Sequence, residues 1–413
     1  STSSGLARAE RGKRVGGLRL RYLLLALAAG FCTAGCAGIP RDPVAVEFVE
    51  KASVLDGAEV RYWGDRAPPN INALTAEKWA QVKANRPELL KQGRPQISFL
   101  AVSGGGSDGA FGAGLLVGWT ARGDRPEFDI VTGVSTGALT APFAFLGPKY
   151  DPALKAVYTT YSTDQLVTKH PVRGLLGGEA LASNAPLAGV IASYINEGFM
   201  AEVAREHARG RRLLIGTTNL DAQRPVIWDM GRIASSNNPR ALALFRNVLL
   251  ASAAIPGLFP PVYIEVEAEG QMRQEMHVDG GTTNQVFLLP TQIKTGRTSS
   301  SLGINPVRRL YIIRNGRIDP EFKVVKANTL AIAGRSISTL IKTQGIGDLY
   351  QMYEFARQNR VGYNLAYIPG DFPDTSTEAF DPIYMSRLFD LGAKLGQSGR
   401  VWTKTPPRLD SPS

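Results

Sequence analysis

Short apolar runs alternate with longer amphipathic stretches over most of the chain after residue 95. The run 97–102, Ile-Ser-Phe-Leu-Ala-Val, predicts a buried strand, and a Gly-rich turn then opens a helix toward Ala121. A second strand is predicted over 128–132, followed by a sharp turn and a helix through 139–146. Further strands are predicted over 212–217, 226–229, 262–266, 275–278, 309–313 and 363–368. Helices are predicted through most of 150–210, with Ser183-Asn184 as a cap before 185–194, and over 239–254, 325–357 and 379–396.

Strands that alternate with helices favour an α/β fold with a mainly parallel central sheet and helices on both faces. No internal repeat or long linker interrupts the pattern, so a single catalytic domain is expected over 95–413, with its motifs in 97–290 and an α/β extension at its C-terminal end. Residues 36–94 are punctuated by Pro and Gly and are interpreted as a tether and lead-in that holds one short helix, about 75–91.

The first 35 residues have the pattern of a targeting segment. A basic stretch reaches Arg21, an apolar run covers 22–31, and small residues precede Cys36. The apolar run is too short to span a bilayer. Thr33-Ala-Gly-Cys36 resembles a bacterial lipobox, with Thr33 where Leu is usual, and this resemblance implies lipidation of Cys36. Ala37 after the lipidated position implies the outer membrane of the cell envelope; an ordinary secretory signal cleaved near Ala34 is the alternative.

Composition and charge exclude several classes of protein. The chain has 413 residues with 44% hydrophobic and 20% charged positions, so it can bury a large core. Its net charge is +11, but six basic residues and one acidic residue fall within the first 35 positions. No dense basic run with interleaved aromatic residues follows, so nucleic acid is not expected as a partner. Both cysteines, Cys32 and Cys36, lie in the targeting region, which excludes disulfides and cysteine-based metal sites from the rest.

A Gly-rich turn follows the first strand. Its residues are Gly104, Gly105, Gly106, Ser107, Asp108 and Gly109. Consecutive glycines before a helix let backbone N–H groups point into an open space, which favours an anion there, either a phosphate or an oxyanion. The spacing also fits G-x-G-x-x-G, so a dinucleotide site with Asp129 on the ribose is one interpretation.

The second turn, Gly133-Val-Ser135-Thr-Gly137, matches G-x-S-x-G at a junction between a strand and a helix. The flanking glycines allow the sharp elbow that exposes a nucleophilic serine. Because the carboxyl ends of parallel strands meet at one edge of a sheet, Ser135 is expected beside the Gly-rich turn. Together these features favour a nucleophile next to an oxyanion cradle.

The serine also needs a base. The chain has three histidines, His170, His207 and His277, and none follows Asp279 as the order of an α/β-hydrolase triad would require. Asp279 precedes Gly280-Gly281 at the end of a short predicted strand, and burial there would raise the pKa of its carboxyl group. Ser135 and Asp279 are therefore predicted to form a dyad, with a triad through His277 left open and a structural role preferred for this histidine.

Four blocks, in order, resemble those of the patatin-like phospholipases. They are the Gly-rich turn at 104–109, the elbow at 133–137, the segment 251–261 and Asp279-Gly-Gly281, and the resemblance runs from about 97 to 290. It implies a Ser-Asp hydrolase fold, Ser135 as nucleophile, Asp279 as base and the Gly-rich turn as oxyanion hole. Asp108 departs from the Arg or Lys that many relatives carry.

Other residues allow two interpretations each. The apolar segment 255–261 could form the wall of an acyl-chain pocket or pack in the core. Asn219 could contact the site but fits a turn better, and Trp119 and Trp228 are interpreted as core residues.

The sequence thus predicts a membrane-tethered serine acyl hydrolase that acts on a phospholipid or another lipid ester. No cofactor and no metal is expected, because no ligand cluster with suitable spacing occurs. A non-catalytic lipid-binding or scaffolding lipoprotein is the alternative, and a nucleotide-dependent oxidoreductase is a more distant one.

Overall fold

The computed structural model describes residues 40–91, 94–169, 180, 182–288, 305–376 and 378–407. The targeting segment, Cys36 and His170 lie outside these residues. In the described part of the chain, no helix combines the length and apolarity needed to cross a bilayer.

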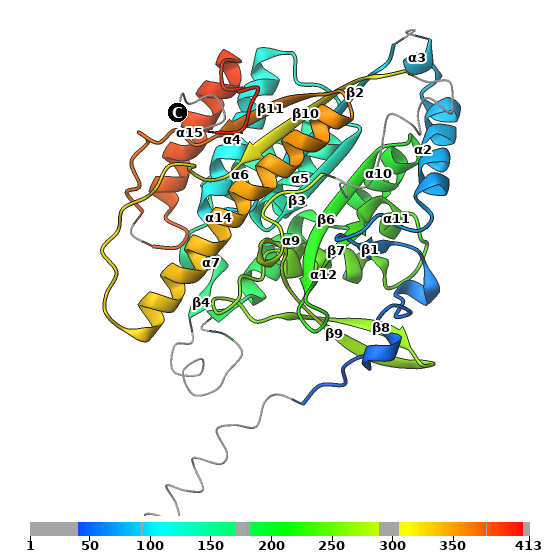
Figure 1. Cartoon of the computed structure of the whole chain (residues 1–413), viewed down its shortest axis with the longest axis horizontal. Helices are drawn as coiled ribbons and strands as arrows, with labels where there is room; N and C mark the ends of the chain where they lie inside the picture. The colour runs from blue at the N-terminus through cyan, green and yellow to red at the C-terminus, as the bar shows by residue number, and fades with distance from the viewer. Residues whose placement is uncertain are drawn as a thin grey trace, which may run out of the picture.

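A nine-stranded mixed sheet forms the centre of the described structure (Figure 1). Five neighbouring strands are parallel, in the order β6, β3, β2, β10, β11. Their bounds are Arg212–Asn219, Ile130–Val134, Gln96–Val102, Val307–Arg314 and Val361–Tyr367. Antiparallel strands continue the sheet beyond β6, and they are β7 (Arg224–Asp229), β1 (Arg61–Trp63), β9 (Gln271–Asp279) and β8 (Val262–Ala268). The predicted α/β fold is confirmed, with antiparallel strands at one side of a parallel core.

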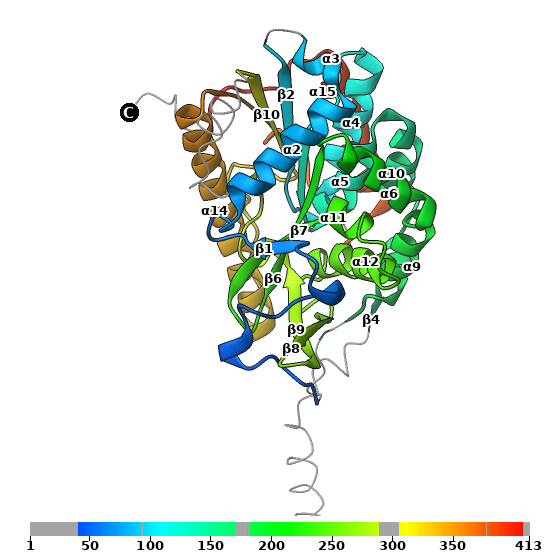
Figure 2. The ribbon, with the colours of Figure 1, turned by 90° about the vertical axis from the view of Figure 1, so that its right-hand side faces the viewer.

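Strand residues alternate between two faces, and each face buries its own core. One core contains Leu100, Val131 and Ile215 of the sheet, and the other contains Phe99, Ile130 and Leu214. The first face is covered by α4 (Gly109–Arg122), α5 (Thr136–Leu146), α6 (Asp151–Thr159), α9 (Ala185–Tyr194), α10 (Glu197–Ala208), α12 (Ala241–Ser252) and α15 (Pro382–Ser398). The second face is covered by α2 (Ile71–Asn85), α3 (Pro87–Leu90) and α14 (Thr329–Gln358). In Figure 2, α14 lies on one side of the sheet and α5, α6 and α10 on the other.

The region before the first parallel strand is packed onto the sheet. Strand β1 pairs antiparallel with β7, and Trp79 and Val82 of α2 are buried against the second face. The helix predicted over 75–91 is two helices, α2 and α3, because Arg86 between them leaves the helical conformation (φ −141°, ψ 50°). Strand β1 was missed, since three residues without strict alternation carry no periodic signal.

Two helices of the first face, α4 and α15, approach each other closely. A Cβ added to Gly114 would lie 2.0 Å from the Phe389 carbonyl oxygen, and one on Gly118 would lie 2.0 Å from that of Ala393. Reciprocally, Cβ atoms on Gly392 and Gly396 would clash with carbonyl oxygens of α4. Backbone therefore packs directly on backbone, and α15 fixes the helix that follows the Gly-rich turn.

Candidate active site

Ser135 lies in the turn between β3 and α5, where the backbone is strained. Its φ of 55° and ψ of −126° are unfavourable for a residue with a side chain. The turn is also tight, because a Cβ on Gly133 would lie 2.4 Å from the Gly137 carbonyl oxygen and one on Gly137 would lie 2.2 Å from that of Val102. The structure thus has the sharp elbow predicted from G-x-S-x-G, with the glycines where close approach requires them. The strand before it begins at Ile130, two residues later than expected, and the Asp129 side chain just before it forms a buried salt bridge with Arg86.

Asp279 meets Ser135 from a different strand. The last residue of β9, Asp279, is paired with Thr217 of β6, and its Oδ2 lies 2.5 Å from Ser135 Oγ. Its Oδ1 accepts a hydrogen bond of 2.7 Å from the Gly281 backbone N–H. Both side chains are buried, each with 5% exposure. The two residues predicted to act together are therefore in direct contact, at a distance typical of a charge-assisted O–H···O bond.

Burial dominates the titration of Asp279. Loss of hydration raises the pKa of its carboxyl group to about 7, although the hydrogen bonds from Ser135 and Gly281 act in the opposite direction. The carboxyl group is therefore a base whose charge changes near neutral pH, the range in which general-base catalysis is most effective.

The described histidines lie beside other residues than Ser135. His277 contacts Thr217 Oγ1 at 2.9 Å through Nδ1 and Glu275 Oε2 at 3.0 Å through Nε2, and it is fully buried. His207 lies beside Asp229, 3.6 Å away. Burial lowers the pKa of both imidazoles. Neither histidine contacts Ser135, which agrees with a structural position for His277.

The Gly-rich turn lies against the nucleophile elbow, but only some of its amides are open. A Cβ on Gly104 would lie 3.1 Å from that of Ser135. The Gly104 N–H already donates to the Gln285 carbonyl, while those of Asp108 and Gly109 donate to carbonyls within the turn. No described residue accepts a hydrogen bond from the N–H of Gly105, Gly106 or Ser107. Of the six residues predicted to form an oxyanion hole, three therefore have a backbone N–H without an acceptor among the described residues.

Asn315, at the end of β10, holds this turn in place. Its Nδ2 donates to the Ser103 carbonyl at 2.9 Å, its Oδ1 accepts from the Gly112 N–H at 3.0 Å, and its N–H donates to Ser103 Oγ at 2.8 Å. A Cβ on Gly105, where φ is 157°, would lie 2.0 Å from the Asn315 carbonyl oxygen. Asn315 carries no sequence motif, so its role was not predicted.

Two further polar groups complete the surroundings. Ser252 of α12 accepts a hydrogen bond from the Ser135 N–H at 3.0 Å and donates to the Gly216 carbonyl at 2.6 Å, which ties the elbow to β6. Asp108 accepts a hydrogen bond of 2.6 Å from the Tyr384 hydroxyl of α15, and burial raises the pKa of its carboxyl group to about 6. Its side chain is thus directed toward α15.

An apolar pocket of about 70 Å³ opens at Ser135. The lining is apolar apart from Ser135 and the hydroxyl-bearing Thr136, Tyr158 and Tyr194, and it holds no ionisable acid or base among the described residues other than tyrosine. Ile255 and Phe259 belong to the wall, so the segment 255–261 contributes to this pocket. The remaining lining residues come mainly from α5, α9 and α12 and include Leu139, Phe143, Leu187, Val190, Ile191 and Leu249.

The remaining candidates lie apart from the site. Asp129 is buried with 2% exposure and bonds Arg86 and the Ser98 N–H, so it does not face the Gly-rich turn as a ribose ligand would. Asn219 accepts a hydrogen bond from the Ala222 N–H, as a turn residue does. Trp119 and Trp228 are buried in the core. Within the described residues, no three His, Cys, Asp or Glu side chains converge as metal ligands would.

Comparison with solved structures finds matches of low similarity. The crystal structure of VipD from Legionella pneumophila has a TM-score of 0.38 at 12% identity and covers 73% of this chain and 66% of its own. Human GIVD cytosolic phospholipase A2 has a TM-score of 0.39 at 10% identity, with 83% and 65% covered. The chain therefore spans slightly less than two thirds of each. No curated protein matches the chain.

A scan against protein families gives a match over the segment that contains both turns and Asp279. The matched residues are 100–291, and the family is described as patatin-like phospholipase. The match begins within β2 and ends beyond Gly281, so it spans each of the four blocks recognised in the sequence. Residues 100–291 of this chain form a patatin-like phospholipase domain, a domain of lipid-hydrolysing enzymes.

Proposed function

We propose that the protein is a serine acyl hydrolase that cleaves lipid esters with a Ser135–Asp279 dyad. Ser135 Oγ attacks the ester carbonyl carbon while its proton passes to Asp279 Oδ2. The tetrahedral intermediate collapses, the bond to the leaving alcohol breaks, and the proton on Asp279 passes to that alcohol. Water then attacks the acyl-enzyme, Asp279 takes its proton and returns it to Ser135, and the carboxylic acid leaves.

The contact of 2.5 Å between Ser135 Oγ and Asp279 Oδ2 carries this proposal. It joins a nucleophile on a strained elbow to a base whose carboxyl group has a pKa of about 7. His277 bonds Thr217 and Glu275, and His207 lies beside Asp229, so the Asp279 carboxylate is the group in position to receive the proton.

The open amides of Gly105, Gly106 and Ser107 are the proposed oxyanion donors. Gly106 lines the same pocket as Ser135, which supports its placement near the reacting carbonyl. Each donor that meets the developing negative charge would stabilise the transition state by about 2.7–4 kcal/mol.

The proposed substrate is a phospholipid or lysophospholipid. An apolar pocket that begins at the nucleophile suits an acyl chain, because the chain transfers its hydrocarbon surface from water to apolar side chains. At about 70 Å³ the pocket is smaller than the roughly 300–1,000 Å³ of typical ligand sites, so side chains of its wall must move to admit a long chain.

Replacement of the nucleophile tests the proposal. Ser135→Ala is expected to abolish both ester hydrolysis and labelling by a fluorophosphonate probe. Ser193→Ala, at an exposed serine of α9, is the matched control and should retain both. Labelling that persists in Ser135→Ala, or wild-type protein that releases no acyl product from phospholipid vesicles or p-nitrophenyl esters, would contradict the proposal and favour a non-catalytic lipid-binding protein.

We also propose that Cys36 is lipidated and tethers the enzyme to the outer membrane of a bacterial cell envelope. The basic stretch, the apolar run and Thr33-Ala-Gly-Cys36 support this. Cys36→Ser is expected to prevent incorporation of labelled palmitate and to release the protein from the membrane fraction. Unchanged labelling would show that the lipid is attached elsewhere.

A further inference from the structure

A second and larger cavity lies on the opposite face of the sheet. Its volume is about 620 Å³, within the range of ligand sites. Phe99, Ile130 and Leu214 form part of its lining from the second face of the sheet, and Trp79 of α2 contributes from the covering layer. The acyl pocket is built on the first face by helices α5, α9 and α12, so the two cavities have no lining residue in common.

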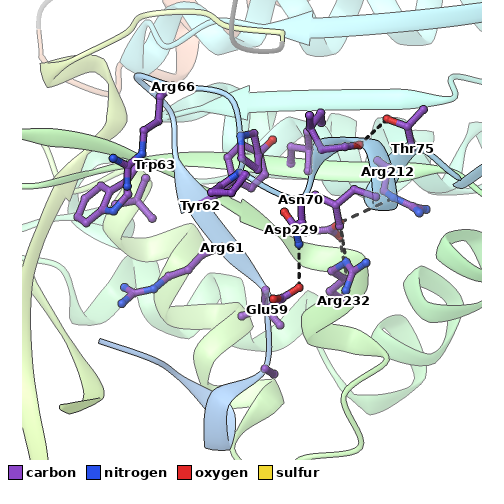
Figure 3. A pocket seen from close by; sticks show the side chains of 18 of the residues that line it. Glu59, Arg61, Tyr62, Trp63, Arg66, Asn70, Thr75, Arg212, Asp229 and Arg232 are labelled. Carbon is purple, nitrogen blue, oxygen red and sulfur yellow. Dashed lines mark hydrogen bonds and ion pairs between the residues drawn. The ribbon is translucent and has the colours of Figure 1, made fainter. Parts of the chain in front are cut away.

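The walls of this cavity are apolar over a large part, but charged groups are gathered at its edge. Figure 3 shows Arg212, Asp229 and Arg232 on one side of Tyr62, and Trp63 and Arg66 on the other. In total, seven basic and three acidic residues belong to the lining. The basic ones are Lys51, Arg61, Arg66, Lys78, Arg212, Arg232 and Arg308, and the acidic ones are Glu50, Glu59 and Asp229.

Most of the guanidinium groups have carboxylate partners. Arg61 pairs with Glu275 at 2.5 Å and Arg66 with Glu50 at 2.6 Å. Arg232 pairs with Glu77, and Arg212 lies 3.8 Å from Asp229. These pairs leave their residues locally neutral, so they form a polar rim rather than a source of unbalanced charge.

Lys78 differs from them. No carboxylate among the described residues lies within 4.0 Å of its ammonium group, which stands over the Trp79 ring at 5.2 Å from the centroid. Asp129 attracts it from further away, but Asp129 is itself paired with Arg86 at 2.8 Å. Loss of hydration, with repulsion from Arg212, Arg86 and Arg308, lowers the pKa of Lys78 to about 8. Lys78 is half-buried, and an ammonium group that loses part of its hydration against an apolar wall favours an anion as its partner.

We propose that this cavity binds a long-chain monocarboxylate, a fatty acid, with the carboxylate on the Lys78 ammonium and the hydrocarbon chain against Phe99, Ile130 and Leu214. The apolar lining of the sheet accepts the chain, and the Lys78 ammonium group beside it matches a single negative charge. The other lysine of the lining, Lys51, is exposed. The site is independent of the proposed ester hydrolysis, since it shares no residue with the acyl pocket.

Tryptophan fluorescence of the full-length protein can test this. The probe is 9,10-dibromostearate below its micelle concentration, because bromine quenches an indole that it contacts. Trp79 and Trp63 line the second cavity, whereas no tryptophan lines the acyl pocket. Saturable quenching is expected in the wild type, and it should disappear when Trp63 and Trp79 are both replaced by Phe. Absence of quenching in the wild type, or quenching that persists in the double variant, overturns the proposal.

Replacement of the charge tests the recognition itself. Lys78→Met is expected to weaken binding of the probe about tenfold, the effect of a lost charge-assisted contact, and Lys78→Arg should restore it. Lys83→Met, an exposed lysine on the same helix, is the matched control and should bind as the wild type does. Equal affinity of Lys78→Met and wild type overturns the assignment. If Lys78→Met fails to fold, competition by palmitate against neutral 1-hexadecanol decides the point, since an equal effect of the two competitors would exclude recognition of the carboxylate.

Discussion

The two cavities lie on opposite faces of one sheet and differ in how each handles charge. The pocket at Ser135 is narrow, about 70 Å³, and is lined by apolar and hydroxyl side chains. The cavity at Lys78 is about 620 Å³ and is edged by paired arginines. Burial acts on an acid in the first case and on a base in the second, raising the pKa of Asp279 and lowering that of Lys78. Loss of hydration thus makes Asp279 a base that titrates near neutral pH on one face, and on the other it makes the Lys78 ammonium group favour an anion as its partner.

The largest effect on kcat is expected from replacing Asp279, whereas replacing the nearby His277 should have little effect. Asp279→Asn removes the proton acceptor from the 2.5 Å contact with Ser135 and should lower kcat for a p-nitrophenyl ester about 10²–10⁴-fold. His277→Ala should keep most of the turnover per folded molecule, since its ring bonds Thr217 and Glu275. The reverse order of the two effects would assign the role of base to the histidine.

A smaller effect is expected from narrowing the acyl pocket. Val190 of α9 lines it, so Val190→Trp should fill space that a long acyl chain needs. Hydrolysis of a long-chain ester should fall about 10–100-fold relative to that of a butyrate ester, because each methylene excluded from an apolar site is worth about 1–3 kcal/mol. The butyrate ester serves as the internal control. An unchanged ratio would place the chain outside this pocket.

The pH dependence should follow Asp279. The carboxylate must be ionised to accept the proton, so kcat/KM is expected to rise about tenfold per pH unit in the acidic range and to level off above the pKa of about 7. A rate already constant from pH 5 upward would contradict a base with this raised pKa.

The smallest expected effect is on stability, and it tests whether both buried charges are unfavourable. Folding raises the pKa of Asp279, so ionisation of its carboxyl group destabilises the folded protein as pH rises from about 4 through 7. Folding lowers the pKa of Lys78, so the protonated ammonium group destabilises the folded protein fully below about pH 8. Asp279→Asn at pH 8 and Lys78→Met at pH 7 should each raise the unfolding midpoint by a few degrees, for about 1–3 kcal/mol. The gain from Asp279→Asn should fade toward pH 4. A lower midpoint in either variant would show that the charged form is well compensated in the fold.

The sequence predicted the parts of the site that depend on local chemistry. Gly133, Ser135 and Gly137 form a motif because the elbow needs small residues at fixed spacing, and Asp279 is marked by the glycines after it. The contacts of Asn315 and Ser252 could not be predicted, since each acts on a backbone far away in the chain. Asn315 belongs to no motif, and Ser252 lies in the block 251–261, whose pattern does not show that its hydroxyl group reaches the Ser135 N–H. For the same reason, which amides of the Gly-rich turn stay open was not predictable, because the Gly104 N–H is occupied by Gln285.

The strands and helices of the sheet were predicted well where apolar runs are long. The strand before Ser135 was predicted to begin two residues early, because Phe128 is apolar and buried and so extends the apolar run, whereas the strand begins at Ile130. The second cavity had no signal in the sequence. Its lining comes mainly from β2, β3, β6, α2 and the segment 49–71, with residues of β7 and β10 and Arg232, and only the fold brings these parts together.

The close packing of α4 on α15 through their glycines determines which part of the chain must fold as one unit. The family match ends at residue 291, yet α15 lies at 382–398 and rests its main chain directly on the helix that carries the Gly-rich turn. A protein truncated after residue 291 would lose β10 and β11 as well, and it would expose the bare backbone groove along Gly114 and Gly118 to water. The segment that matches the family is therefore shorter than the segment that must fold together, which extends at least to the end of α15. Deletion mapping should find no active fragment that lacks α15.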